Sequence, residues 1–470
     1  MRMGSLIGLI KSGLAIGLLC GGWAWAQKKA DWQNPQVTGI HKMAARSSFF
    51  SYENHNLALK AKPGFSRFYQ PLNGHWKFYW AEKLHAREDY FYRTTFDDFS
   101  WDSIAVPANW EMHHYGIPFY LNNRYEFARP DTAPTAVPVA TNQVGQYRKY
   151  FHIPRSWSGR SVWLTFGSVS SAFYLWVNGL KVGYSQGSKL PATFDISEYV
   201  QPGRNVLAVE VYRWSDGSLL ECHDSWRLSG IEREVYLEAR PRVHISDISV
   251  RAGLDVQQQL GKLEVEVTLT NELSKAIQQY WLEAELIDPD GWNVIDFATN
   301  QMFRLESKSQ SAVVFAESLP APMPWTAETP HLYTLLLTLR NEAGEVLEVV
   351  PVKIGFRNVE VHNGKLLLNG KPLSLRGVNY QEHDPHTGHV LTEAALRKDL
   401  SLMKQHNINA IRTKGHPQSE LFYELCDQYG FYVIDEANIE SEGIPFASDQ
   451  TPGQQTPVAA GTPRPPQTHG

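Results

Sequence analysis

Three short segments near the C-terminal end of this 470-residue sequence carry residues that could bind or cleave a polar substrate. They are Asn379–His383 (NYQEH), Arg412–His416 (RTKGH) and Asp435–Glu440 (DEANIE). Carboxylates and imidazoles transfer protons, and together with amides they hold hydroxyl groups in fixed directions. The alternative is that these residues only cap solvated loops. Which interpretation holds depends on the elements that precede the three segments.

A strand–helix–strand–helix–strand pattern precedes and separates them. Apolar runs at 373–378, 410–413 and 432–435 predict three short strands. Two amphipathic stripes predict the helices between them: Leu396, Leu400 and Met403 after a capping Thr392, then Leu421, Leu425 and Tyr429 before a terminating Gly430. Such alternation implies parallel strands with right-handed crossovers. Barrel enzymes keep their chemistry at the carboxyl ends of such strands, where all three segments lie.

The region before residue 357 is predicted to be almost entirely β-structure. Ala172–Val177 and Leu180–Tyr184 flank Asn178-Gly179, which favours a type I′ hairpin because both turn residues must adopt positive φ. Leu263–Leu269 alternates with period two, and Tyr333–Leu339 reads as another strand. We expect a jelly-roll β-sandwich at 27–241, an immunoglobulin-like β-sandwich at 242–356 and part of a (β/α)8 barrel at 357–446.

The two ends of the sequence differ from the rest. Arg2, the apolar run Leu14–Cys20 and Ala24-Trp25-Ala26 predict a signal peptide at 1–26, with an uncleaved anchor as the alternative. We therefore expect export to the periplasm or the medium, and no stable membrane span after cleavage. Residues 447–470 are rich in proline and lack apolar periodicity, which predicts disorder.

Composition narrows the classes of partner. Lys and Arg number 44 against 49 Asp and Glu, a net charge of −5, and without a basic patch no nucleic-acid partner is predicted. The 15 Trp suit either sandwich cores or sugar stacking. Two cysteines, Cys222 and Cys426, remain after the predicted signal, too few for a disulfide scaffold.

Ordered motifs across 31–446 resemble glycoside hydrolase family 2, and most closely its large β-galactosidases. The motifs that carry this resemblance are Val106–Trp110, Arg213–Ser218, Asp224–Ile231, Glu328–Tyr333, Leu368–Pro372, Arg376–Asn379 and Asp435–Glu440.

The resemblance implies hydrolysis of terminal β-D-galactose with retention of configuration, by two glutamates about 5 Å apart. In the family the acid/base follows the fourth barrel strand and the nucleophile lies on the seventh, and this sequence shows three. We therefore expect no catalytic residue here, a truncated barrel and an inactive chain. A non-catalytic carbohydrate-binding protein is the alternative. For the full-length parent, a homo-oligomer is compatible with the resemblance.

The resemblance also implies site residues. Asn122 and Asp224 match residues that hold galactose, Asp224 partly through Na⁺, while Glu382, His383 and His416 lie on the expected substrate face. Asn122 could instead make an Asx turn, and Asp224 could brace its loop.

The implied metal ligands are Glu440, Glu442 and again Asp224, with Mg²⁺ at the two glutamates. For Glu440 the alternative is a salt bridge. The sequence departs from the family at Gln381, Gly415 and Glu442, where histidines are usual. These departures motivate another alternative, a parent specific for algal galactan oligosaccharides.

Overall fold

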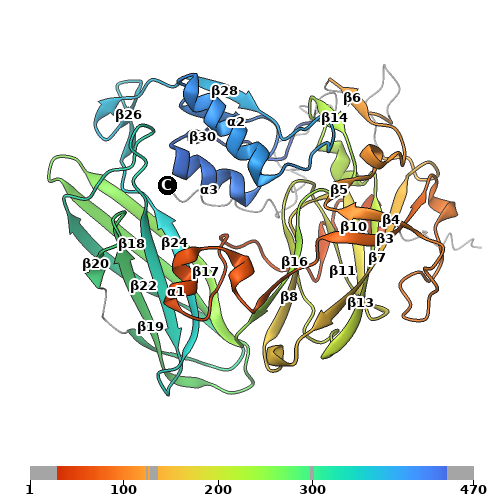
Figure 1. The fold of residues 1–470 in the computed structure, drawn as a ribbon, viewed down its shortest axis with the longest axis horizontal. Coiled ribbons are helices and arrows are strands. Elements are labelled where there is room, and N and C mark those ends of the chain that lie inside the picture. The colour runs from red at the N-terminus through yellow and green to blue at the C-terminus, as the bar shows by residue number, and fades with distance from the viewer. Residues whose placement is uncertain (1–28, 123–124, 128–135, 297–300, 442–470) are drawn as a thin grey trace, which may run out of the picture.

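Two β-sandwiches lie side by side, and a smaller α/β segment lies across them (Figure 1). The computed structural model describes residues 29–122, 125–127, 136–296 and 301–441. The predicted signal peptide and the predicted disordered tail lie outside these residues. The architecture confirms the predicted fold class: a jelly roll, an immunoglobulin-like sandwich and an incomplete (β/α)8 barrel.

The jelly roll packs a seven-stranded sheet against a four-stranded one. The first sheet has the order β1-β11-β10-β13-β7-β3-β4: Gly39–Ile40, Leu180–Gln186, Ala172–Val177, Gly203–Tyr212, Val144–Ile153, Gly74–Ala81 and Asp102–Val106. The second has the order β12-β8-β16-β2: Ala192–Asp195, Ser161–Phe166, Val235–Arg240 and Tyr69–Pro71. The predicted hairpin is confirmed, since Asn178 and Gly179 have φ of 52° and 86° between β10 and β11.

Two small sheets extend the jelly roll toward the α/β segment. One has the order β5-β15-β9 (Ala108–Asn109, Gly230–Ile231, Val169–Ser170), and the other pairs β6 (Phe119–Leu121) with β14 (Ser225–Arg227). Short 3₁₀ helices occur at Asp31–Gln33, Pro63–Phe65, Leu84–Ala86, Trp110–His113, Arg155–Trp157 and Asp216–Leu219. The last of these leads into the loop that carries Asp224.

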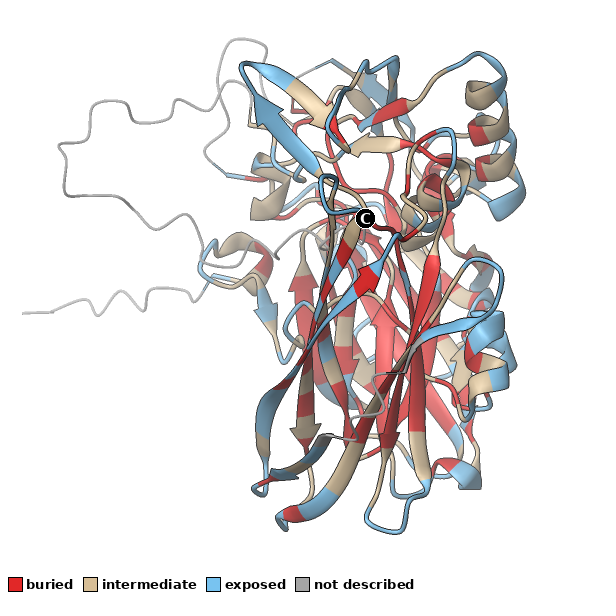
Figure 2. Ribbon diagram, turned by 90° about the vertical axis from the view of Figure 1, so that its left-hand side faces the viewer, coloured by how far each residue is buried: buried red, intermediate tan, exposed pale blue. Residues whose placement is uncertain are grey.

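The immunoglobulin-like sandwich also has two sheets. One has the order β17-β18-β22 (Val243–Asp255, Leu260–Asn271, Ser309–Pro320). The other has the order β20-β19-β23-β24 (Asn293–Asp296, Ile277–Ile287, Tyr333–Arg340, Val346–Ile354), with β21 (Gln301–Leu305) also on β19. The predicted alternation is seen in β18, where buried and outward residues alternate along the strand. In Figure 2 the buried residues are concentrated on the inner strands of the sandwiches, while other strands alternate between buried and more exposed residues.

Strand β23, which the sequence predicted as a strand, is buried on both faces. Its second face is covered by α1 (His55–Lys60) and the residues before it, with Tyr52 and Ala58 packed against Leu336 and Val349. Tyr52 also pairs with Val349 through two backbone hydrogen bonds of 2.9 and 2.8 Å. A segment assigned from sequence to the jelly roll therefore contacts the immunoglobulin-like sheet.

A three-stranded hairpin sheet, β25 (Val359–His362), β26 (Lys365–Leu368) and β27 (Lys371–Pro372), leads into the barrel segment. The first barrel strand, β28, runs over Gly377–Tyr380, later than the predicted 373–378. The prediction was wrong because β27 pairs with β26 and the Leu373 amide donates to the Leu366 carbonyl, so these residues extend the hairpin.

The barrel segment contains β28, α2 (Glu393–Gln405), β29 (Ala410–Thr413), α3 (Glu420–Tyr429) and β30 (Tyr432–Ile434). The three strands are parallel, as predicted. Thr392 caps α2 by accepting from the Ala395 amide, and Gly430 ends α3 in the left-handed conformation. None of the helices in the described part of the chain is long and apolar enough to span a bilayer.

A substitution at Gly430 tests how the barrel segment packs against the immunoglobulin-like domain. The φ of Gly430 is +78°, and a Cβ there would lie 2.4 Å from the Ala327 carbonyl oxygen. We expect Gly430→Ala to lower the free energy of unfolding by about 2 kcal/mol or more, because the substitution adds both backbone strain and the clash with Ala327. Gly344→Ala is the control, since Gly344 has φ +80° and nothing within 4 Å, so only the strain of about 1 kcal/mol applies. Equal shifts in calorimetric unfolding midpoints for the two variants would contradict this contact.

Candidate active site

The parallel register of the barrel strands brings the three chemical segments to one edge. Val378 lies beside Ile411, and Ile411 lies beside Val433, so the segments that follow β28, β29 and β30 leave the sheet together. Arg412 donates to Glu436 from Nε at 2.5 Å, and the Gly415 amide donates to the same carboxylate at 2.7 Å. Asp435 accepts from Thr413 at 2.8 Å. The predicted strand-end cluster is therefore one hydrogen-bonded edge.

The jelly roll adds an arm to this edge through β6 and β14. Leu121 pairs with Ser225, so Asn122 and Asp224, the next residues outward, lie at the same end of the pair. Asn122 is exposed. The two residues that the sequence singled out for sugar binding are thus brought together, although 102 positions separate them in the sequence (224 − 122).

Asp224 is held by residues from three elements. Its Oδ1 accepts from the Tyr120 hydroxyl at 2.6 Å, and its Oδ2 accepts from Lys414 Nζ at 2.7 Å. Its backbone carbonyl accepts from Gln381 Nε2 at 3.0 Å. The hydrogen bonds from Lys414 and Tyr120 lower the pKa of Asp224, so it is an anion at neutral pH.

An aromatic group borders Asp224. Trp226 is 37% exposed and stacks on His383 with ring centroids 5.8 Å apart. Tyr120 meets Trp226 edge-on at 5.7 Å and is 52% exposed. Half-exposed aromatic rings beside a fixed carboxylate suit a sugar. The apolar face of the sugar ring can stack on an aromatic ring, while the sugar hydroxyls donate to the carboxylate oxygens. His383 is exposed and stacks on Trp226 at this edge, and its role in substrate binding stays a prediction.

Glu382 and His416 lie elsewhere. Glu382 is 5% exposed and belongs to a buried ionic cluster, the Lys189 cluster, formed by Lys189, Glu232, Arg233, Glu382 and His389. His416, also 5% exposed, contacts the Pro417 carbonyl through Nδ1. Its burial, with the nearby Lys189 charge, lowers its pKa to about 3. The structure thus turns both side chains away from the open face on which the sequence prediction placed them.

Lys189 is the centre of this cluster. Its Nζ lies 2.7 Å from Glu232 Oε2, 3.1 Å from Glu382 Oε1 and 2.8 Å from His389 Nδ1. Arg233 holds Glu382 with contacts of 3.2 and 3.1 Å and donates to the Pro417 carbonyl at 3.0 Å. Lys189, Glu232 and Arg233 come from the jelly roll, whereas Glu382, His389 and Pro417 come from the barrel segment, so the cluster joins the two.

The pKa values of the cluster carboxyls depend on these partners. Burial alone would raise the pKa of Glu382, but Arg233, Lys189 and then His416 lower it to about 2. Burial likewise opposes ionisation of Glu232, yet Lys189 and His389 hold its pKa well below the ordinary value. Both carboxylates are therefore charged although they are buried.

Sequence reasoning missed Lys189, Glu232 and His389. Glu232 directly follows the motif 224–231, which was the one available signal, but nothing in the sequence pairs it with Lys189 or His389. Asn109 completes the junction: its Nδ2 donates to Glu232 at 3.0 Å, and its Oδ1 accepts from the His389 amide at 2.8 Å.

Glu440, a predicted metal ligand, lies against the loop of the jelly roll. Its backbone amide donates to the Leu220 carbonyl at 2.6 Å, and its Oε2 lies 3.0 Å from His223 Nδ1. Its side chain keeps 30% exposure. Glu442 lies outside the described residues. Within the described ranges, no three His, Cys, Asp or Glu side chains are gathered as a metal site.

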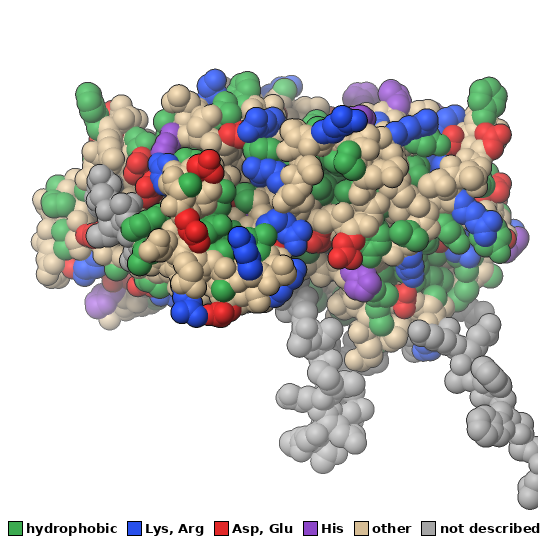
Figure 3. All heavy atoms as spheres, turned by 90° about the horizontal axis from the view of Figure 1, so that it is seen from below, with side chains coloured by type: hydrophobic (Ala, Val, Ile, Leu, Met, Phe, Trp, Pro, Cys, Tyr) green, Lys and Arg blue, Asp and Glu red, His purple; other side chains and the backbone are tan. Residues whose placement is uncertain are grey.

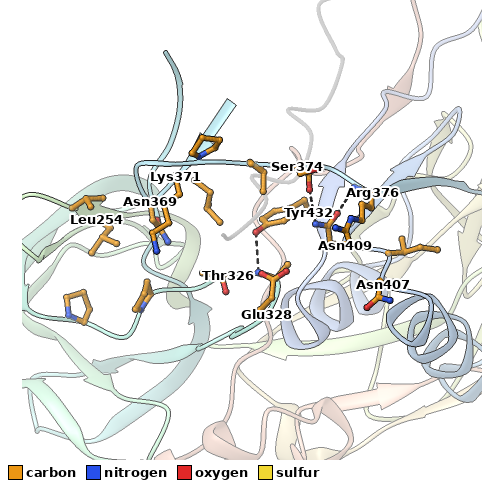
Figure 4. A pocket seen from close by; sticks show the side chains of 18 of the residues that line it. Leu254, Thr326, Glu328, Asn369, Lys371, Ser374, Arg376, Asn407, Asn409 and Tyr432 are labelled. Carbon is orange, nitrogen blue, oxygen red and sulfur yellow. Dashed lines mark hydrogen bonds between the residues drawn. The ribbon is translucent and has the colours of Figure 1, made fainter. Parts of the chain in front are cut away.

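A cavity of about 960 Å³ lies at the opposite end of the barrel strands (Figure 4). Arg376, Asn409 and Tyr432, which line it, stand at or before the starts of β28, β29 and β30. The cavity also borders the immunoglobulin-like domain through Leu254 and Thr326. It is therefore distinct from the edge that carries Asp224.

Seen from below, basic and acidic side chains are interspersed over the surface of the molecule (Figure 3).

Comparison with known proteins covers most of the chain. Residues 69–241 match the model described as "Glycosyl hydrolases family 2, sugar binding domain". Residues 243–357 match "Glycosyl hydrolases family 2", and residues 359–463 match its "TIM barrel domain".

Among curated proteins, a β-galactosidase of Priestia megaterium is 41% identical over 418 residues, covering 88% of this chain and 40% of the relative. One of Psychromonas ingrahamii is 40% identical over 428 residues, with the same two coverages of 88% and 40%. The chain therefore spans about 40% of the length of these relatives. A Bacteroides uniformis β-glucuronidase structure has a TM-score of 0.66 at 24% identity, covering 79% of this chain and 42% of that one, and shows the fold alone.

The Lys189 cluster yields a stability prediction. We expect Lys189→Met to lower the free energy of unfolding by about 3 to 5 kcal/mol, because it leaves Glu232 and Glu382 buried with too little positive charge nearby. Arg251→Ala is the matched control: it breaks the exposed 3.0 Å pair with Glu264 and should cost less than about 1 kcal/mol. Urea unfolding at neutral pH measures both. A Lys189→Met loss as small as the control would refute the role of the cluster.

Glu382 gives a pH dependence of known sign. Its folded-state pKa of about 2 lies below the ordinary 4.5, so ionisation stabilises the fold above pH 4.5 and this contribution is lost as pH falls toward 2. We expect the free energy of unfolding of wild type to be higher than that of Glu382→Gln by on the order of 3 kcal/mol near neutral pH. This difference should shrink below pH 4.5. Urea unfolding from pH 7 to 3 checks this. A difference that stays constant over that range would contradict the assignment.

Proposed function

This chain belongs to glycoside hydrolase family 2, and from that premise we propose that it serves the hydrolysis of terminal, non-reducing β-D-galactose residues of β-galactosides. The observation that carries the proposal is the 41% identity over 418 residues to a protein named β-galactosidase. The strand-end edge beside Asn122 and Asp224 supports it with a plausible chemistry for holding a sugar.

The described residues supply the part of the site that holds the sugar. The Asp224 carboxylate accepts hydrogen bonds from sugar hydroxyls, and the exposed amide of Asn122 can both donate and accept. Trp226, backed by His383, offers an apolar face to the ring. Water is displaced from this face when the sugar stacks, which strengthens the polar contacts beside it.

The reaction itself needs two carboxylates about 5 Å apart, one as nucleophile and one as acid/base. By resemblance these glutamates follow later barrel strands. Glu436, which Arg412 and the Gly415 amide hold, is not one of them, because in the family this strand end is structural and metal-binding. The role proposed for this chain is therefore to bind and orient the galactoside, with the two glutamates supplied from the remainder of the barrel.

We further propose Mg²⁺ near Glu440, with Glu442 as a second ligand. The partly exposed Glu440 carboxylate is a hard oxygen donor, and the contact of its Oε2 with His223 Nδ1 helps to orient it. When bound, the ion would neutralise the charge of its carboxylate ligands. Export through the segment 1–26 is likewise proposed, on its signal-like sequence.

A second candidate function is favoured by one observation. Gln381, at a position where the family usually has His, donates to the Asp224 carbonyl at 3.0 Å and so contributes to the wall of the sugar site. A site altered in this way suits a different galactoside, and oligosaccharides of algal galactans are the candidates.

A chimera tests the proposed function. Residues 29–440 of this chain would be joined to the part of the Priestia megaterium β-galactosidase that follows its matching segment. We expect hydrolysis of aryl β-galactosides, and not of β-glucuronides or β-glucosides, with the intact relative as control. Preference for β-glucuronides would contradict the proposal, and preference for algal galacto-oligosaccharides over lactose would favour the second candidate.

In the same chimera, Asp224→Asn should lower kcat/KM for the galactoside by about 10- to 100-fold. The substitution removes charge-assisted hydrogen bonds to the sugar, each of which contributes about 1.5 to 3 kcal/mol. Glu264→Gln, at an outward-facing position of β18 in the immunoglobulin-like domain, is the matched control and should leave kcat/KM unchanged. An Asp224→Asn chimera as active as its parent would exclude Asp224 from the sugar site.

A further inference from the structure

The surroundings of Asp224 do not match those of a carboxylate that shares a sodium ion with its substrate. Oδ2 is bound to Lys414 Nζ at 2.7 Å, Oδ1 accepts from Tyr120 at 2.6 Å, and the backbone oxygen accepts from Gln381 at 3.0 Å. All three oxygens that Asp224 could offer to a cation therefore already accept a hydrogen bond from the protein.

A sodium ion needs several oxygen ligands directed toward it, as hard cations do. At Asp224 the three partners are two nitrogen donors and one hydroxyl that donates, so none of them presents an oxygen lone pair toward the carboxylate. An ammonium at 2.7 Å also repels a second cation at the same oxygen. The residues present do not fit Na⁺, in contrast to what the family resemblance implied.

We propose that Lys414 is the resident cation of Asp224, replacing a bound sodium ion and making the sugar subsite independent of Na⁺. The proposal rests on the proposed function for the identity of the sugar, but the cation itself is assigned from the contacts of Asp224. Lys414 follows β29 directly, so the parallel register of the barrel strands delivers its ammonium to the arm of the jelly roll.

Lys414 can also contact the substrate. Its side chain is 31% exposed and that of Asp224 is 22% exposed, so the pair lies at the surface of the site rather than beneath it. An ammonium carries three N–H donors and Asp224 accepts one. The remaining donors can meet sugar hydroxyls, which makes Lys414 a positioning residue for Asp224 and a donor in the subsite.

Sodium binding to the full 470-residue chain tests the proposal without any galactoside. For wild type we expect no saturable broadening of the ²³Na NMR signal, and equal unfolding midpoints in NaCl and KCl at the same ionic strength. Lys414→Ser frees Asp224 Oδ2 and adds a hydroxyl oxygen, so it should gain saturable broadening and a higher midpoint in NaCl than in KCl.

Two controls separate the effect of this ammonium from a general loss of charge. Lys414→Arg keeps a cation and should stay without a sodium effect. Lys262→Ser breaks the 3.2 Å pair with Asp255 in the immunoglobulin-like domain and should gain none.

Saturable Na⁺ binding by wild type would overturn the proposal, whether or not the variants fold. A folded Lys414→Ser that gains no sodium effect would overturn the assignment of Lys414. Because these readouts need no substrate, their failure is distinct from a chimera that lacks galactosidase activity.

Discussion

The structure depends on the neutralisation of charges buried between the jelly roll and the barrel segment. In the Lys189 cluster, the cations of Lys189 and Arg233 face the carboxylates of Glu232 and Glu382, so the formal charges balance. A buried charge that loses its partner costs several kcal/mol, so each part of the chain needs the other in place. Because hydrogen bonds have direction, this requirement also sets the orientation of the segment that follows the first barrel strand against the jelly roll.

The candidate site lies next to this junction and follows from it. Glu382 is in the cluster, while its neighbours Gln381 and His383 point to the open edge and contact Asp224 and Trp226. Farther along the same edge, Asn438 donates to the carbonyl of Ser188 at 2.6 Å. Ser188 is the residue that precedes Lys189 in the sequence. One rigid junction thus sets the positions of side chains from both parts, as a sugar subsite requires.

Local patterns predicted much of the fold, and long-range contacts explain what they missed. The Asn178-Gly179 turn and the alternation in β18 depend on neighbouring residues, so the sequence alone revealed them. Helix α1 was missed because its burial comes from β23 and β24, far along the chain. In the candidate site, family resemblance indicated Asn122 and Asp224, and the end of a predicted strand indicated His383; their roles in sugar binding stay predictions. Lys189 and His389 lie 200 residues apart, and no local signal links them.

The most direct test of this account is hydrogen exchange measured by mass spectrometry on peptides of the full chain. If the buried cluster joins the two parts, peptides over 377–413 and over 216–224 should be protected together, and Lys189→Met should raise exchange in both while sparing β18. Free exchange over 377–413 in wild type, beside a protected jelly roll, would show that the barrel segment is not held by the cluster and would contradict the account.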